Sequence, residues 1–283
     1  MFKKIKTDLE INAELIEAAL SKHYNLPDHN LDNLIKAQRY GLLGGGKRIR
    51  AFLTMEICKL FGGKAEAAMP YACAIEMIHA SSLIHDDLPC MDNDDFRRGK
   101  PSTHKVYGEN IALLAGDCMM VKAFEVIINN PYSTDETNAQ AIRILCESTG
   151  SNGMLAGQGM DVYASNNKLD FESLISLHRH KTGCLISASA KLGCLAAGIE
   201  LNSEKFKSAV EYSESIGLAF QIIDDILDYL NGQKELNSFL SFMTLEEARK
   251  YAKDLTQHGI DAIKAYDDGT LRDLAEYLIF REY

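Results

Sequence analysis

Acidic side chains gather at two places in the sequence, each directly behind an apolar stretch. These two groups comprise Asp86, Asp87, Asp92, Asp94 and Asp95, and then Asp224, Asp225 and Asp228. Carboxylates beside buried apolar residues must be paired or must bind a cation, because an isolated buried anion is costly. Hard carboxylate oxygens with no His or Cys at ligand spacing favour Mg²⁺, which keeps bound waters and is shared with substrate phosphates. The pattern therefore predicts a magnesium site for a phosphorylated substrate.

The spacing within each group supports this interpretation. Asp224 and Asp228 are four residues apart and would project from one face of a helix. Pro89 disfavours helix at the preceding residue, so the chain can turn there and bring Asp92 back toward Asp86. One acidic group alone could be the solvated face of a surface helix. Two such groups, each behind an apolar run, favour a metal site instead.

Basic residues form three further groups. The segment Gly44-Gly-Gly-Lys-Arg-Ile-Arg50 joins a glycine loop to the expected start of a helix. Backbone N–H groups and cationic side chains can converge on an anion at such a place. Arg97 and Arg98 follow the first acidic group, and Lys181-Thr182 interrupts an apolar helix. Together these groups predict anion binding close to the carboxylates.

Two other segments resemble functional motifs but do not fit them. The glycine segment lacks the spacing of a P-loop, and no strand is expected before it. Glu76-Met-Ile-His79 resembles the Glu-x-x-His of a di-iron helical bundle, but that site needs two such motifs and the chain has one. A single histidine on an apolar helix face is more often a core residue than a functional one.

Composition excludes several classes of protein. The 283 residues carry 30 Lys and Arg against 40 Asp and Glu, a formal charge of −10, which argues against nucleic acid as the main partner. No apolar run reaches the roughly 18 residues of a membrane span, and no secretory signal is visible at the N-terminus. Seven cysteines without a Cys-x-x-Cys pair, most of them among apolar neighbours, predict buried free thiols in a reducing compartment. We expect a cytoplasmic protein.

Helix signals dominate the chain, which has only five prolines and little strict alternation of apolar and polar residues. Ser203, Asp170 and Thr244 stand where helix N-caps are expected, and Glu247 completes a capping box with Thr244. We predict an all-α fold, a single domain over residues 1–283, with ten or more helices around a central cavity. The expected helices cover residues 8–22, 30–42, 47–61, 65–88, 108–129, 135–149, 152–163, 171–197, 203–230, 244–266 and 270–282.

The combination resembles the trans-isoprenyl diphosphate synthases. Leu83–His104 is similar to their first aspartate-rich motif, and Phe220–Asp228 is similar to their second. Gly45–Arg50, Gly157-Gln-Gly-Met-Asp161 and Lys181-Thr182 match in the same order and spacing. The likeness runs from about residue 30 to the C-terminus and is strongest for the short-chain farnesyl and geranylgeranyl diphosphate synthases.

The resemblance implies a role for each group of residues. Asp86, Asp92 and Asp224, supported by Asp87, Asp225 and Asp228, would hold three Mg²⁺ ions on an allylic diphosphate. Arg97, Lys181, Thr182 and Gln221 would assist them, and Lys47, Arg50, His79 and Arg98 would hold the diphosphate of isopentenyl diphosphate. The allylic substrate would ionise, the isopentenyl double bond would attack the cation, and a proton would be lost to the released diphosphate. A homodimer is also implied.

The resemblance leaves two questions, the length of the loop after Asp228 and the length of the product. About a dozen residues that the family places after Asp228 are absent; either the loop is short or a segment is missing from this sequence, and we expect the second. Ser81 and Ser82, just before the first motif, leave room for a growing chain, with Met77, Met119 or Met120 deeper. Products of C15 and C20 both fit. The alternatives are a class I terpene cyclase, which would not need the isopentenyl cluster, and a non-catalytic partner subunit of another synthase.

Overall fold

Helices account for most of the chain, as its composition predicts. The computed structural model describes residues 2–24, 32–233 and 235–280. The elements are α1 (Lys3–Lys22), α2 (Asp32–Leu42), α3 (Ile49–Leu60), α4 (Ala65–Asp86), β1 (Phe96–Arg97), β2 (Lys100–Pro101), α5 (Thr103–Tyr107), α6 (Glu109–Ile128), α7 (Asp135–Thr149), α8 (Met154–Ala164), α9 (Phe171–His178), the π-helix η2 (Arg179–Gly183), α10 (Cys184–Ala196), α11 (Glu204–Leu230), the 3₁₀ turn η3 (Phe239–Ser241), α12 (Leu245–Ile263) and α13 (Thr270–Ile279).

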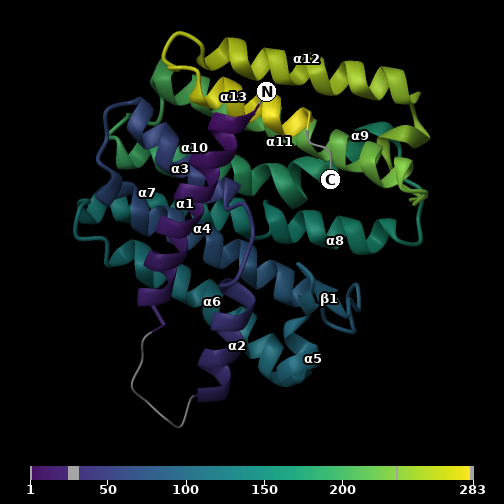
Figure 1. Ribbon diagram of the computed structural model, residues 1–283, viewed down its shortest axis with the longest axis horizontal. Coiled ribbons are helices and arrows are strands. Elements are labelled where there is room, and N and C mark those ends of the chain that lie inside the picture. The colour runs from purple at the N-terminus through teal and green to yellow at the C-terminus, as the bar shows by residue number, and fades with distance from the viewer. Residues whose placement is uncertain (1, 25–31, 234, 281–283) are drawn as a thin grey trace.

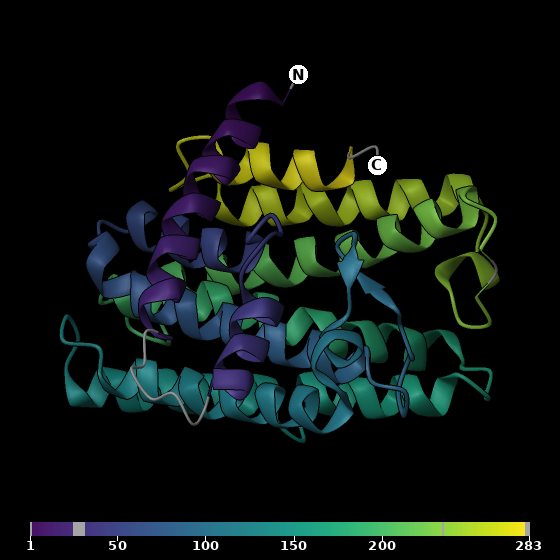
Figure 2. The ribbon, with the colours of Figure 1, turned by 60° about the horizontal axis from the view of Figure 1, so that its bottom comes forward.

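The helices stack in layers, with α12 and α13 on one side and the teal helices that include α6 and α8 on the other (Figures 1 and 2). Helix α4 packs against α3, α6 and α10, and α11 packs against α10 and α12. Buried residues occur all around α4, from Ala67 to Ile84, as expected for a central helix. Helices α4 and α11, which carry Asp86 and the second acidic group, are therefore held inside the molecule.

Three predicted helix starts are confirmed in atomic detail. The side chains of Ser203, Asp170 and Thr244 accept hydrogen bonds from backbone N–H groups in the first turns of α11, α9 and α12. Thr244 and Glu247 also form the complete capping box. Local sequence chemistry thus sets where these helices begin.

The helix expected over residues 171–197 is confirmed as one continuous helical run from Phe171 to Ala196, but the structure places a π-helical turn, η2, between α9 and α10, which the sequence did not predict. The five residues of η2 follow a π-helical path, which is rare and is often found at functional sites. The first helix also begins earlier than expected, at Lys3.

A two-stranded hairpin was not expected from the sequence. Phe96 and Arg97 pair antiparallel with Pro101 and Lys100, and the turn between them is Arg98-Gly99. Both turn residues have positive φ, 53° and 73°. That conformation suits a tight hairpin, which is usually announced by Asn-Gly or Asp-Gly.

Within the described ranges, no helix is both long and apolar enough to cross a membrane. All seven cysteines are free thiols, as predicted, but only Cys58, Cys73 and Cys194 are buried, so the expectation that most of them are buried is wrong.

Candidate active site

A cavity of about 390 Å³ lies between α4, α6, α8 and η2. Its polar lining includes Arg50, His79, Asp86, Gln158, Lys181 and Thr182. Its apolar lining includes Leu83, Leu88, Met91, Leu113, Met120, Met154 and Leu155. The structure therefore brings Asp86 and four of the predicted anion-binding residues to the wall of one largely apolar cavity, whereas Asp87, Arg97 and Arg98 line a neighbouring hollow.

The first acidic group turns back on itself at the end of α4. The backbone N–H of Asp92 donates to the carbonyl of Asp86 at 2.9 Å, which confirms the turn predicted at Pro89. Burial, together with the nearby charges of Asp92 and Asp87, raises the pKa of Asp86 to about 6 against the opposing effect of Lys181. Burial likewise raises the pKa of Asp92. Two carboxylates that resist ionisation side by side are suited to a divalent cation.

Asp87 faces a different partner. Its carboxylate is buried and accepts from Nε of Arg97 at 2.8 Å, while Nη2 of Arg97 also reaches Asp94 at 2.9 Å. Burial raises the pKa of Asp87 although Arg97 opposes the shift. This carboxylate fixes the first arginine of the hairpin at the rim of the site.

The second acidic group lies on α11, and its aspartates also have different partners. Asp224 accepts from the Nε2 amide of Gln221 at 3.0 Å. Asp225 is buried and accepts from the backbone N–H of Phe239 at 2.7 Å, and burial raises the pKa of Asp225 to about 6. Asp228 lines a separate hollow with Asp225 and Glu235. Asp225 therefore anchors η3 against α11.

Lys181 and Thr182 reach the cavity from η2. Nζ of Lys181 pairs with Asp161 on α8 at 2.5 Å, and the Thr182 hydroxyl donates to Oε1 of Gln221 at 3.0 Å. Gly157 permits this arrangement, because a Cβ there would lie 2.1 Å from the backbone nitrogen of Lys181. The π-helix and α8 thus join the lysine, Gln221 and Asp224 in one connected set of contacts.

The structure brings together some, but not all, of the residues predicted to bind isopentenyl diphosphate. His79 is surrounded by guanidinium groups, and burial followed by the charges of Arg50 and Arg98 holds its pKa well below the usual range. The buried Nε of Arg50 has no hydrogen-bond partner within the described residues, so this side chain has capacity for an anion. Lys47 is exposed, and its ammonium lies over the ring of Tyr277 at 5.3 Å from the centroid.

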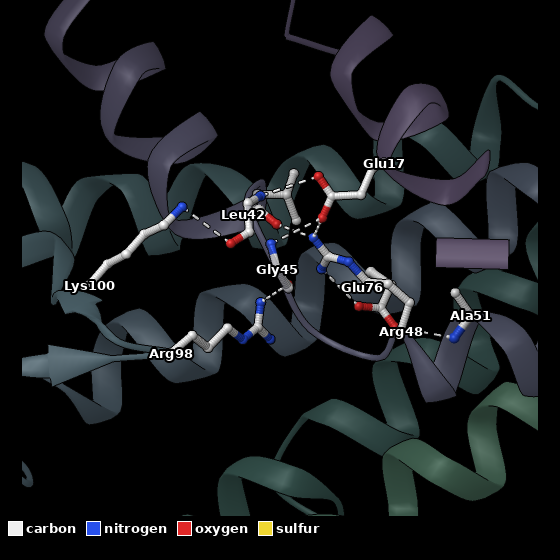
Figure 3. Close-up of polar contacts among 9 residues, drawn as sticks. Glu17, Leu42, Gly45, Arg48, Ala51, Glu76, Arg98 and Lys100 are labelled. Atoms are coloured by element: carbon white, nitrogen blue, oxygen red, sulfur yellow. Dashed lines mark hydrogen bonds and ion pairs between the residues drawn. The ribbon is translucent and has the colours of Figure 1, made fainter. Parts of the chain in front are cut away.

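Sequence reasoning missed the role of Arg48. This residue is 3% exposed and has a left-handed φ of 50°. Its guanidinium pairs with Glu17 on α1 and with Glu76 on α4 (Figure 3). Glu76, a lone acid within an apolar helix, was the available signal that a buried cation lies opposite.

Comparison with known proteins places these features in a family. Residues 32–240 match the family described as Polyprenyl synthetase. The chain belongs to the polyprenyl synthetase family. A chloroplastic geranylgeranyl pyrophosphate synthase of Capsicum annuum is 38% identical, over 97% of this chain and 76% of the relative. A dimethylallyltranstransferase of Fischerella ambigua is 37% identical, over 95% of this chain and 82% of the relative.

Solved structures support the same conclusion. The apo structure of an FPP/GFPP synthase from Zymomonas mobilis is 35% identical and superposes with a TM-score of 0.91, covering 99% of this chain and 100% of that one. A geranyltransferase from Legionella pneumophila is 30% identical, with a TM-score of 0.90, covering 98% of this chain and 97% of that one. The all-helical isoprenoid synthase fold is thereby shown for this polyprenyl synthetase.

Members of the polyprenyl synthetase family typically depend on magnesium, so the carboxylates must suit that ion. Within the described ranges, no three His, Cys, Asp or Glu side chains are close enough to form a complete cage. An open, oxygen-only donor set is what Mg²⁺ uses when substrate phosphates and waters complete its coordination. The raised pKa of Asp86 indicates a carboxylate that would gain from a cation. The residues fit the ion.

Asn237, in the connection after the second motif, binds the segment that joins α8 to α9. The side-chain amide of Asn237 donates to the carbonyls of Ala164 and Asn167 at 2.7 and 2.9 Å, and its Oδ1 accepts from the N–H of Leu169 at 2.8 Å. The sequence expectation of a missing segment stays a prediction, which the gene sequence would test.

Proposed function

We propose that this protein is a short-chain trans-prenyltransferase that condenses isopentenyl diphosphate with allylic diphosphates and releases diphosphate. The observation that carries the proposal is one largely apolar cavity whose lining includes the Asp86 carboxylate and, separately, the Arg50 guanidinium beside His79, with Arg98 close enough to lower the pKa of His79. The first suits a metal-bound diphosphate and the second suits a diphosphate without metal. A single-substrate enzyme would have no need of the second group.

In this proposal the carboxylates hold the ions that bind the allylic diphosphate. Asp86, Asp92 and Asp224 are the principal ligands, with Asp87, Asp225 and Asp228 supporting them. Because Asp87 binds Arg97 and Asp225 binds the Phe239 backbone, we assign these two a mainly positioning role. When bound, magnesium supplies positive charge where the leaving diphosphate becomes more negative.

Other residues hold and shield the reacting groups. Lys181, Thr182, Gln221 and Arg97 assist the allylic diphosphate, while Arg50, His79, Arg98 and Lys47 bind the isopentenyl diphosphate. Leu113, Met120 and Met154 exclude water from the allylic cation. Basic side chains near the reacting carbons are not needed, because the released diphosphate can accept the proton.

The product is farnesyl or geranylgeranyl diphosphate. Ser81 and Ser82 both line the cavity, as the proposed chain-length role requires. Met120 lines it too, whereas Met77 and Met119 are fully buried and are not among its lining residues. The deeper limit therefore involves Met120 and, from α8, Met154.

We also propose a homodimer. Helix α6 carries Leu113, Leu114, Val121 and Ile128 with between 46% and 68% of their surface exposed. So many large apolar side chains on one long helix favour burial against a second copy. The mass in solution tests this proposal.

Product chromatography tests the function. The purified protein is incubated with Mg²⁺, isopentenyl diphosphate and each of the C5, C10 and C15 allylic primers. The proposal expects linear prenyl diphosphates of C15 or C20. Cyclised hydrocarbon alone would identify a terpene cyclase, and a folded protein without condensation activity would identify a partner subunit.

A further inference from the structure

The glycine loop Gly44–Lys47 lies between α2 and α3 and precedes Arg50. All three of its glycines have positive φ, between 95° and 133°, a path that other residues rarely adopt. Arg48, directly after the loop, is also left-handed although it has a side chain. Such a backbone persists only where its surroundings hold it in place. The contacts that hold it therefore decide where the anion-binding side chains stand.

One carboxylate provides much of that support. Glu17 of α1 accepts from the N–H of Gly44 at 3.2 Å and from that of Gly45 at 3.4 Å. It also pairs with Nη2 of Arg48 at 2.5 Å. Burial raises the pKa of Glu17, but Arg48 and the two amides lower it further, so the group is an anion at neutral pH. A single side chain thus binds Gly44 and Gly45 at the start of the loop and Arg48 directly after it.

The opposite side of the loop is held from the hairpin. Arg98 donates to the carbonyl of Gly45, and Lys100 donates to the carbonyl of Gly44 at 3.3 Å (Figure 3). A Cβ on Gly46 would lie 2.9 Å from the guanidinium carbon of Arg98. The loop is therefore clamped between α1 and the hairpin, and its position also sets that of Arg98.

Arg48 carries the arrangement into the core. Its Nη1 donates to Glu76 at 3.0 Å, and the other oxygen of Glu76 accepts from the N–H of Ala51 at 3.2 Å. Ala51 follows Arg50 in the first turn of α3, and Glu76 lies one turn before His79 on α4. The ion pairs therefore link α1 to the two helices that supply Arg50 and His79.

From these contacts we propose that Glu17 is a positioning residue for the isopentenyl diphosphate pocket. It fixes the loop and Arg48, and through them the placement of Arg50, His79 and Arg98. Glu17 touches none of the predicted allylic ligands. It also lies outside residues 32–240, the part of the chain that matches the family. This inference rests on the proposed function and specifies which substrate α1 serves.

Steady-state kinetics of Glu17→Gln tests the proposal. We expect the KM for isopentenyl diphosphate to rise at least tenfold, which corresponds to about 1.4 kcal/mol of binding. The KM for the allylic diphosphate should change less than about twofold, because its ligands lie on α4, η2 and α11. Glu14→Gln, an exposed change on the same helix, is the matched control and should resemble wild type.

A second variant separates positioning from simple loss of folding. Arg48→Lys keeps a positive charge but cannot bind Glu17 and Glu76 at once, so it should raise the same KM. The Glu17→Gln/Arg48→Lys double variant should then add little further loss, since both act through one pair. Circular dichroism confirms that each protein is folded.

The outcomes are distinguishable. If wild type condenses the substrates and folded Glu17→Gln has an unchanged KM for isopentenyl diphosphate, the inference is wrong and the proposed function stands. Equal rises in both KM values would also overturn it, because they indicate general damage. If wild type itself does not condense the substrates, the proposed function fails.

Discussion

The carboxylate of Asp225 binds the backbone N–H of Phe239, fourteen residues further along the chain, at 2.7 Å. The Phe239 ring in turn stacks on His178 with centroids 5.2 Å apart. His178 also lies 3.4 Å from Oε1 of Gln221, which binds Thr182. Asp225 thus helps to hold η3 and His178 in place, whereas Asp224 contacts the side chain of Gln221.

The two aspartates should therefore respond differently to substitution. Asp225→Ala leaves the buried N–H of Phe239 without an acceptor and should lower the free energy of unfolding by about 1–3 kcal/mol. Asp224→Asn should leave stability near that of wild type and lower kcat by about 10²-fold or more, as removal of a key electrostatic group does. Thermal denaturation and steady-state kinetics on both variants make the comparison. Equal loss of stability in the two would contradict the assignment.

Gly157 offers a test of the π-helix. In Gly157→Ala the new methyl would lie 2.1 Å from the backbone nitrogen of Lys181, so η2 must move and carry Lys181 with it. We expect a lower melting temperature and at least a tenfold lower kcat/KM for the allylic diphosphate. Gly159→Ala on the same helix meets no atom within 4 Å and is the control. It should keep activity and gain up to about 1 kcal/mol from helix propensity.

Metal binding should depend on pH in a defined direction. Burial raises the pKa of Asp86 from 3.8 to about 6, so the folded protein without metal holds this proton more tightly than the unfolded chain. The resulting stabilisation is complete below about pH 4 and is lost as the pH rises through about 6. Binding of Mg²⁺ requires the ionised carboxylate, so it strengthens over the same range.

Differential scanning fluorimetry measures this effect. The rise in melting temperature caused by Mg²⁺ with inorganic diphosphate should be larger at about pH 8 than at about pH 5. Asp86→Asn should have a smaller rise and should lose much of its pH dependence. A rise of equal size at both pH values in wild type would show that Asp86 does not bind the ion.

Product length should follow the size of the side chains before the first motif. Ser81→Phe places a ring in the cavity wall and should shift the product toward shorter chains. Because Ser81 is fully buried, overpacking costs about 1–3 kcal/mol, so the half-buried Ser82→Phe provides a second variant. Met119→Leu, at a buried position outside the cavity lining, is the control. Unchanged product length in both folded serine variants would remove them from the chain-length wall.

Features set by neighbouring residues were predictable from the sequence. The caps at Ser203 and Thr244 act within one turn, and Pro89 ends its helix locally. The acidic groups stood out because the runs before them are apolar. The amino-acid sequence alone therefore indicated the helical architecture and several polar residues of the cavity, but not most of its apolar lining from α6 and α8.

Features that depend on distant contacts were not predictable. The hairpin turn at Arg98-Gly99 begins with Arg instead of the usual Asn or Asp. Arg98 has a left-handed backbone, and its side chain donates a hydrogen bond to the carbonyl of Gly45. The π-helix packs closely against Gly157, which lies 24 residues before Lys181 in the chain. Glu17 and Arg48 are 31 residues apart. No periodicity or local propensity reports such pairings.

The directions of three helices give the site an intrinsic polarity. Helix α4 ends at Asp86, and Asp228 lies in the last turn of α11, so these two carboxylates stand at the negative ends of helix dipoles. These ends repel a bare diphosphate and attract a cation. Helix α3 instead begins beside Arg48 and Arg50, and its positive end favours an anion without metal. In the proposed reaction, backbone orientation would thus help to sort two chemically similar diphosphates into different places, one that arrives with metal and one that does not.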